Sequence, residues 1–118
     1  MSHRALQLSL ERGERGWQAW SLRLLGEAAA SRAPADVESA DAAYRRAMVL
    51  ADELGMRPLV ARCQLGLGSL YRRASKRPQA GEHLATATAM FGELEMPWWL
   101  DQARRETELL TAADSRSS

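Results

Sequence analysis

Leu67-Gly68-Ser69-Leu70-Tyr71 belongs to a pattern that occurs twice in this chain of 118 residues. In both copies a Leu-Gly pair is followed, at wide helical spacing, by an alanine, a large residue and a second alanine. The matching positions are Leu67-Gly68, Ala80, Leu84 and Ala87 in one copy and Leu25-Gly26, Ala40, Tyr44 and Ala47 in the other. The front halves are offset by 42 residues, and the back halves, residues 52–56 and 92–96, by 40. A unit of this length that recurs predicts a helical repeat protein.

This order of leucine, glycine, alanine and aromatic residues resembles the tetratricopeptide repeat family of helix-turn-helix units, over about residues 14–112. Residues 16–26, Gly-Trp-Gln-Ala-Trp-Ser-Leu-Arg-Leu-Leu-Gly, look like the opening of longer repeats in the C-terminal arrays of bacterial signalling ATPases and class III nucleotide cyclases. None of the catalytic motifs of those proteins is present. The resemblance implies a short right-handed solenoid of stacked antiparallel helix pairs.

The composition favours helices throughout. The chain has no Ile and no Asn and only three Val, while Ala, Leu, Arg and Glu dominate. These abundant residues favour helices, and few of the residues present favour strands. We therefore predict one all-α domain, short for a solenoid, which needs about three repeats to bury its faces.

Turn and cap residues divide the chain into six expected helices, arranged as three antiparallel hairpins. We expect Gly13 to end a first short helix and Pro34 to forbid continuation of the second. Asp36 is a good N-cap, Gly55 suits a left-handed C-cap, and Pro97 suits a first helical turn. The expected parts are a truncated helix of a preceding repeat (1–13), repeat one (14–56), repeat two (57–96), a half repeat or capping helix (97–112) and a disordered tail (113–118).

Charge and cysteine content argue against several classes of protein. Sixteen basic and fifteen acidic residues leave a net charge of +1, which gives no electrostatic case for nucleic acid or an anionic membrane surface. The single cysteine, Cys63, excludes an internal disulfide and a cysteine-based zinc site, and we expect a buried thiol. The chain has no signal-like start and no apolar run near the ~20 residues that span a bilayer, so we expect a cytoplasmic protein.

The sequence offers no convincing catalytic, metal or cofactor site. Gly66-Leu67-Gly68 could be half of a dinucleotide fingerprint, but no strand precedes it, and close helix packing explains Gly68 better. His83 and His3 lack partners at a spacing that would assemble a metal site, so we expect surface histidines. Carboxylates cluster at helix ends, and serines and threonines lack a paired base. We therefore expect no enzyme, catalytic residue, metal or cofactor.

Four tryptophans in so short a chain are informative. Trp98 and Trp99 point about 100° apart on a helix, so both cannot enter one core. The more exposed ring either caps the solenoid or anchors an interface, and both alternatives remain open. In the helix after residue 14 we expect Trp17, Leu24 and Leu25 on the core face, and we expect Trp20 in a groove.

In the tetratricopeptide fold the first helix of each unit lines a concave groove. On this chain the corresponding positions off the expected core stripe are Trp20, Arg23, Glu27 and Ala30 in repeat one, and Arg62, Leu65, Ser69 and Arg72 in repeat two. The Asn and Lys with which some members grip a terminal carboxylate are missing, because the chain has no Asn and Lys76 lies in a turn. An arginine-lined trough suits an acidic or extended ligand, although a solvated charged face is the alternative.

These observations favour a non-catalytic interaction or scaffold module that binds a protein or peptide, with an acidic segment as the expected ligand. The alternative is a self-association module, a homodimer through the terminal helix that carries Trp98 and Trp99. In that case the chain would be a regulatory fragment of a bacterial signalling ATPase or cyclase.

Overall fold

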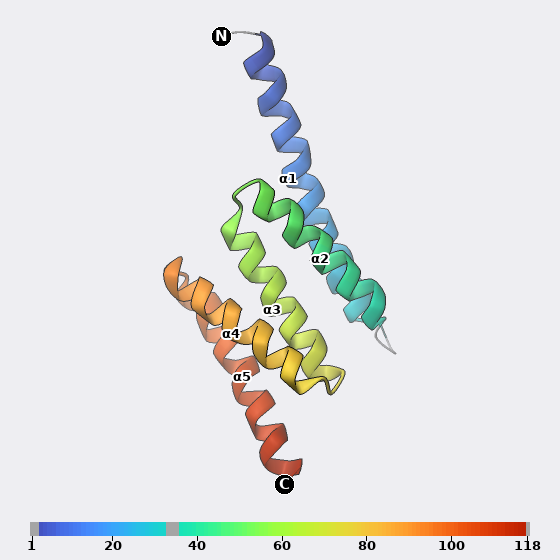
Figure 1. Ribbon diagram of the computed structural model, residues 1–118, viewed down its shortest axis with the longest axis vertical. Helices are drawn as coiled ribbons and strands as arrows, with labels where there is room; N and C mark the ends of the chain where they lie inside the picture. Colours follow the sequence, from blue (N-terminus) through green and yellow to red (C-terminus); the bar gives the residue numbers. More distant parts are fainter. Residues whose placement is uncertain (1–2, 33–35, 118) are drawn as a thin grey trace.

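The computed structural model describes residues 3–32 and 36–117, with side chains for residues 13–32 and 36–112, and this part contains helices and no strand. Consecutive helices run antiparallel and pack as helix-turn-helix units (Figure 1). The all-α repeat fold predicted from the sequence is confirmed. The helices are α1 (His3–Ala30), α2 (Val37–Glu53), α3 (Arg57–Arg73), α4 (Arg77–Glu93) and α5 (Pro97–Ser117).

The described chain has five helices where six were expected, because α1 continues through Gly13. Glycine weakens a helix by roughly 0.5–1 kcal/mol relative to alanine, but it does not forbid one as an internal proline does. Gly13 lacks the positive φ of a terminating cap, and good helix formers surround it. The two expected helices before residue 32 are therefore one helix of 28 residues.

The last helix is also longer than predicted. α5 continues to Ser117, through most of the segment 113–118 that was expected to be a disordered tail, while Ser118 lies outside the described residues. After Pro97 the sequence contains no proline or glycine that would stop a helix. Polarity alone was therefore a poor signal for a helix end.

Three short connections join the last four helices with the same backbone geometry. Each one has a residue in the left-handed region, with φ of 71° at Gly55, 62° at Ser75 and 54° at Glu95. The residue after each donates its backbone N–H to a carbonyl in the last helical turn, for example Met56 to Ala51 at 2.8 Å. This is the hydrogen-bond pattern of a Schellman cap. The cap predicted at Gly55 is confirmed, and so is the N-cap at Asp36, which accepts a hydrogen bond from the Ser39 N–H.

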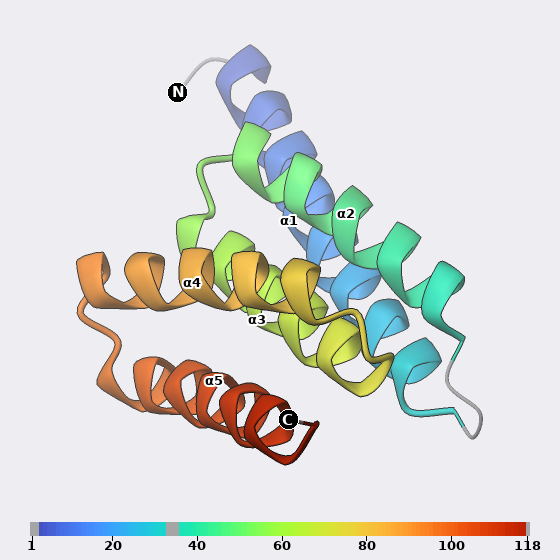
Figure 2. The same cartoon turned by 60° about the horizontal axis from the view of Figure 1, so that its bottom comes forward.

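Helix α3 lies at the centre of the molecule. It packs closely with α4, and it also contacts α1, α2 and α5. The pairs α1/α2 and α3/α4 form two hairpins, and α5 covers the open side of the second (Figure 2). The molecule is elongated, with extents of 64 × 32 × 19 Å, and the first turns of α1 project beyond the end of α2 (Figure 1).

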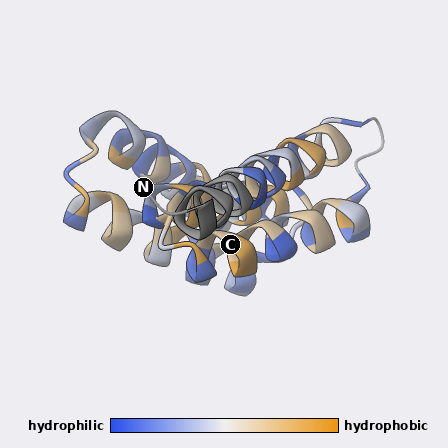
Figure 3. Cartoon of the chain, turned by 90° about the horizontal axis from the view of Figure 1, so that it is seen from above, coloured by the Kyte–Doolittle hydropathy of each residue, from blue (hydrophilic) through white to orange (hydrophobic). Residues whose placement is uncertain are grey.

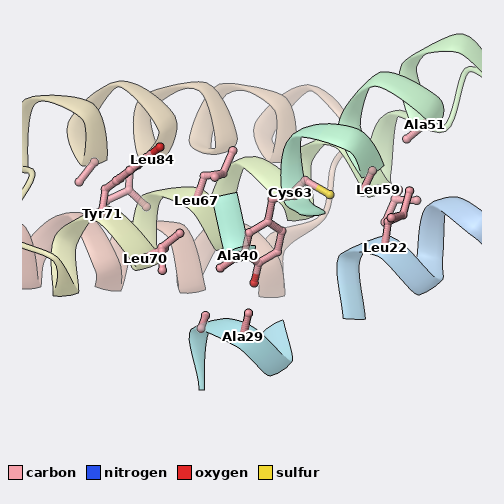
Figure 4. Close-up of a cluster of buried hydrophobic side chains, with 14 of the residues drawn as sticks. Leu22, Ala29, Ala40, Ala51, Leu59, Cys63, Leu67, Leu70, Tyr71 and Leu84 are labelled. Carbon is pink, nitrogen blue, oxygen red and sulfur yellow. The ribbon is translucent and has the colours of Figure 1, made fainter. Parts of the chain in front are cut away.

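Glycines let the paired helices approach closely. The position of a Cβ on Gly68 would lie 2.5 Å from Leu84 of α4, and one on Gly26 would lie 3.0 Å from Tyr44 of α2. These are equivalent pairs of the two repeats. The packing role expected for Gly68 is therefore confirmed. The cluster around these contacts holds the buried leucines of α3 together with Cys63 (Figure 4).

The core face of α1 differs from the predicted one. Trp17 is 75 % exposed, and Leu24 and Leu25 are also exposed, whereas Ala19 and Leu22 are buried. Apolar residues lie on two sides of this helix, and the side with small residues packs against α2 because alanine permits a short interhelical distance. The prediction chose the larger side chains and was wrong for Trp17, Leu24 and Leu25. Ala30, expected in the groove, is buried for the same reason.

Ion pairs repeat with the same offsets as the sequence. Arg15 of α1 pairs with Glu53 of α2, and Arg57 of α3 pairs with Glu93 of α4 at 2.7 Å. All four side chains are exposed, so each pair adds little stability. Their repetition marks the equivalence of the two hairpins.

Polar and apolar residues are mixed along the helices (Figure 3). Within the described residues, no helix combines the length and apolar character that a membrane span requires.

Candidate functional site

A pocket of about 230 Å³ lies between the first helices of the repeats, α1 and α3, and the last helix, α5. Five of the eight residues predicted for the groove line it, and both residues of the Trp98-Trp99 pair do so as well. The predicted residues that line it are Arg23, Glu27, Arg62, Leu65 and Ser69, together with Trp98 and Trp99. We call Trp20, Arg23, Arg62, Trp98 and Trp99 the tryptophan–arginine groove.

Arg23 is the charged side chain that the fold buries most deeply among the described residues, with 6 % of its surface exposed. One terminal nitrogen donates a hydrogen bond to Glu27, one turn further along α1. Its Nε–H is buried and has no acceptor. An unsatisfied buried donor costs about 1–3 kcal/mol, and the residue that carries it lines the pocket.

Arg62 lies between two indoles. Its guanidinium carbon is 5.3 Å from the centre of the Trp20 ring and 4.3 Å from that of the Trp99 ring, distances typical of cation–π contacts. Burial, followed by the positive charge of Arg23, lowers the pKa of Arg62. Among the described residues, no oxygen accepts a hydrogen bond from this guanidinium. Its forked donors are therefore available to a ligand.

Trp98 and Trp99 differ in solvent exposure, as their positions on the helix predicted. The ring of Trp99 stacks on Phe91 at 6.0 Å and is partly buried, whereas Trp98 is 62 % exposed. The two indoles meet edge to face, with ring centres 4.7 Å apart. Trp98 therefore presents an apolar surface at the rim of the pocket, and Phe91 and Arg62 fix the orientation of Trp99.

Arg72 differs from Arg62 because it pairs with a carboxylate of the same chain, that of Glu106. Its Nε donates to Glu106 of α5 at 2.6 Å, and the Ser69 hydroxyl donates to the same carboxyl group at 3.4 Å. The pair joins α3 to α5 at one end of the pocket. Arg72 thus positions Glu106 through its Nε–H.

Several pocket residues were not predicted for the groove, chiefly Tyr44, Arg73, Gln102 and Glu106. Three of them come from α2 or α5, and the expected groove used only the first helices of the two full repeats. Gln102 and Glu106 are one turn apart and follow Trp98 at the same spacing. This i, i+4, i+8 series was the signal that could have found the α5 wall.

An apolar depression continues the groove along α1. Trp17, Trp20 and Leu24 line it together with Met56 at the start of α3. Trp20 also contacts the guanidinium of Arg23 at 5.2 Å, so its ring joins the apolar depression to the charged pocket. The combined surface offers flat apolar area beside concentrated positive charge.

A polar network lies among α2, α3 and α4. Tyr71 donates a hydrogen bond to Asp41 and stacks on His83 at 5.5 Å, and Nδ1 of His83 lies 2.7 Å from the side-chain oxygen of Gln64. Burial, followed by the charge of Arg45, lowers the pKa of His83. His83 is therefore half-buried and packed, where a surface position was expected, and the network ties three helices together.

Within the described residues, no three His, Cys, Asp or Glu side chains gather at a spacing that would hold a metal ion. A comparison with protein families, curated proteins and solved structures gives no match for this chain. The geometry of the tryptophan–arginine groove is therefore the basis for assigning a function.

Proposed function

We propose that this chain is a non-catalytic protein-interaction module, related in architecture to tetratricopeptide repeats, that binds an extended acidic segment in the tryptophan–arginine groove. The repeat geometry supports this relation, because equivalent glycine contacts and ion pairs recur at the sequence offsets. The groove lies on the face formed by α1, α3 and α5. α1 and α3 are the first helices of their pairs, and α5 occupies the next such position.

One observation carries the proposal. Arg23 keeps a buried donor without an acceptor, and Arg62 is held by two indoles with its donors unused, at the same pocket. Buried polar groups are normally hydrogen-bonded, so unused donors at a pocket indicate a ligand that completes them. Tryptophan and arginine are also the residues that most often dominate the binding energy of protein interfaces.

The test is selection from a random peptide library displayed on phage. We expect the enriched peptides to combine an acidic residue with a neighbouring aliphatic or aromatic residue, since the groove offers guanidinium donors beside flat indoles. Trp20→Ala combined with Arg62→Ala should weaken the selected peptides by about 1–3 kcal/mol, the range for charge-assisted hydrogen bonds. This is roughly a 5- to 150-fold change in Kd, measured by fluorescence anisotropy.

Arg46→Ala is the matched control, because Arg46 is an exposed arginine of α2 outside this pocket. It should leave the affinity unchanged, and circular dichroism should show equal helix content in all variants. Equal affinity of the double variant and the wild-type chain would place binding elsewhere on the molecule. Failure to enrich any peptide would count against the interaction function itself.

Self-association is a second candidate, favoured by the exposed face of α1. Trp17, Leu24 and Leu25 are 75 %, 53 % and 60 % exposed, and the first turns of this helix project without a neighbouring helix (Figure 1). Trp17, Trp20 and Leu24 follow the spacing of three and four residues at which apolar side chains pair in a coiled coil. The self-association role predicted for Trp98 and Trp99 stays a prediction.

Sedimentation velocity at several concentrations tests this candidate. If two α1 helices pair, the wild-type chain should sediment as a dimer at micromolar concentration, and Trp17→Ala with Leu24→Ala should return it to a monomer. Val49→Ala, which removes an equally exposed apolar side chain from α2, should have no effect. A monomer at every concentration would exclude this role.

A further inference from the structure

Helix α1 carries an exposed face in the same register as buried faces of α3 and α5. Equivalent residues are 42 positions apart in α1 and α3, as the repeated ion pairs show, and 40 positions apart in α3 and α5, as the repeated caps show. We call Trp17, Ser21, Leu24 and Ala28, which share one side of the helix, the outer face of α1. All four residues are exposed.

In α3 the equivalent face is covered by α2. The residues in this register are Leu59, Cys63, Gly66 and Leu70, and all except Gly66 are fully or almost fully buried. The position of a Cβ on Gly66 would lie 2.6 Å from the ring of Tyr44 in α2. The helix that buries this face is therefore the second helix of the preceding pair, and it runs antiparallel to α3 (Figure 1).

In α5 the equivalent face is covered by α4, again the second helix of the preceding pair and again antiparallel (Figure 2). Trp99, near the start of α5, stacks on Phe91, near the end of α4, with ring centres 6.0 Å apart. Ala103 is buried in the same cluster as Phe91. Further along α5, Leu110 lies 3.8 Å from the position of a Cβ on Gly81, near the start of α4. Two helices of this chain thus bury the same register in the same way.

The outer face of α1 resembles that of α5 most closely. Trp17 stands at the position of Trp99, and Ser21 stands at the position of the small Ala103. Within the described chain α1 contacts only α2 and α3, and neither covers Trp17, which is 75 % exposed, or Leu24. Apolar side chains that gather on an exposed helix face indicate an interaction surface.

We infer that the outer face of α1 is a docking surface for an α-helix of a partner protein, which lies antiparallel to α1 as α4 lies on α5. This helix has an aromatic residue near its C-terminal end, which stacks on Trp17, and a small residue about ten positions earlier, opposite Ala28, as Phe91 and Gly81 have in α4. The inference goes beyond the proposed function, because this face is not the tryptophan–arginine groove.

A second copy of α1 does not match this description. Residues 25–30, the last turns of the helix, are Leu-Gly-Glu-Ala-Ala-Ala and contain no aromatic residue. An antiparallel α1 would therefore have no ring to place on Trp17 in the geometry that Trp99 and Phe91 adopt. Docking of an amphipathic helix on an apolar surface is a common mode of recognition between proteins.

Helix α4 supplies the probe, because it covers the equivalent face of α5. The probe is a synthetic peptide of residues 76–96, held helical by a hydrocarbon staple between positions 82 and 86, which are exposed in α4. It contains no tryptophan, so every indole N–H resonance comes from the full chain, which is labelled with nitrogen-15. The peptide is titrated into this chain, and the indole resonances are followed by NMR.

We expect the peptide to shift the Trp17 indole resonance saturably. Trp17→Ala in the chain and Phe91→Ala in the peptide should each raise the Kd about tenfold or more, because a desolvated aromatic anchor dominates such an interface. Trp17→Phe keeps a ring and should bind like the wild-type chain. Val49→Ala, which removes an exposed apolar side chain from α2, is the matched control and should leave the Kd unchanged. Fluorescence anisotropy of a labelled peptide measures these affinities, and circular dichroism checks that each variant keeps its helix content.

Four outcomes would overturn the inference. The first is no saturable shift of Trp17, and the second is equal binding of the Phe91→Ala peptide. A shift of Trp99 in place of Trp17 would show that the peptide displaces α4 within the chain. A shift of Trp17 that depends on chain concentration without peptide would show that a second copy covers this face. Arg62→Ala separates the outer face from the groove, because it should leave peptide binding unchanged, and a loss of binding would place the peptide in the groove.

Discussion

At the scale of single residues, Tyr44 shows how this fold uses glycine. The ring of Tyr44 is 4 % exposed and lies between Gly26 of α1 and Gly66 of α3. A Cβ on Gly66 would be 2.6 Å from the ring, and a Cβ on Gly26 would be 3.0 Å from it, so the ring packs closely against both glycines. Burial, followed by the negative charge of Glu27, raises the pKa of Tyr44 to about 12.

Gly66→Ala should therefore destabilise the protein by about 1–3 kcal/mol, the usual cost of overpacking a filled core. Gly81→Ala is the matched control, because the nearest atom to its added Cβ is Leu110 at an ordinary 3.8 Å. The control should gain about 0.5–1 kcal/mol from the better helix propensity of alanine. Urea unfolding followed by circular dichroism measures both changes. Equal unfolding midpoints for the two variants would contradict the close packing of Tyr44 against Gly66.

Cys63 gives a chemical test of core packing. It is fully buried, and burial raises the pKa of its thiol from the ordinary 9.0 to about 12. At pH 8 the folded chain should hold about 10³-fold less thiolate than the unfolded chain, and the thiolate is the reactive form. Iodoacetamide labelling followed by mass spectrometry should be slow without denaturant and rapid in 6 M urea. Rapid labelling of the folded chain would show that α3 is not packed at this position.

The sequence predicted these residue roles unevenly, for a physical reason. The packing of Gly68 was predictable because its partner Leu84 belongs to the same hairpin and the same repeat unit. The close packing of Gly66 was not predictable, because its partner Tyr44 comes from the neighbouring hairpin. The packing of one hairpin on another produces no periodic pattern in the sequence. The burial of Arg23 could not be predicted for the same reason, because the sequence does not show how far an arginine side chain is buried.

At the scale of helices, the caps were the most predictable feature and the faces of α1 the least. Asp36, Gly55 and Pro97 act through neighbouring residues, so local rules locate them. The face of α1 was ambiguous, because Ala19 and Leu22 form one apolar stripe while Trp17 and Leu24 form another. Only the packing of α2 decides which stripe is buried.

The three equivalent caps predict stability changes of opposite sign for substitutions to and from glycine. Ser75→Gly and Glu95→Gly should each stabilise the protein by about 0.5–1 kcal/mol, because glycine removes the cost of a left-handed conformation at a small entropic loss. Gly55→Ala should cost about 1–2 kcal/mol at the equivalent position. Thermal and urea unfolding measure the three changes. Stabilisation by Gly55→Ala would contradict the shared cap geometry.

At the scale of the whole molecule, stability should be uneven along the chain. Helix α3 contacts all four other helices, so its amides can exchange only when most of the molecule opens. The first turns of α1 extend beyond α2 and have no packed neighbour within the described chain (Figure 1). Isolated helical segments shorter than about 12–15 residues are marginal in water.

We therefore predict that hydrogen exchange, followed by mass spectrometry, is slowest for residues 59–71 and fastest, among the helical residues, for residues 4–13. If the chain is a monomer, this difference in exchange rate should be the same at every protein concentration, because no second copy packs against the first turns of α1. Protection of residues 4–13 that grows with protein concentration would instead show that a second copy covers this segment, as the self-association candidate requires. Rapid exchange in α3 would contradict its central place in the fold, because a helix that contacts all four others opens only together with its neighbours.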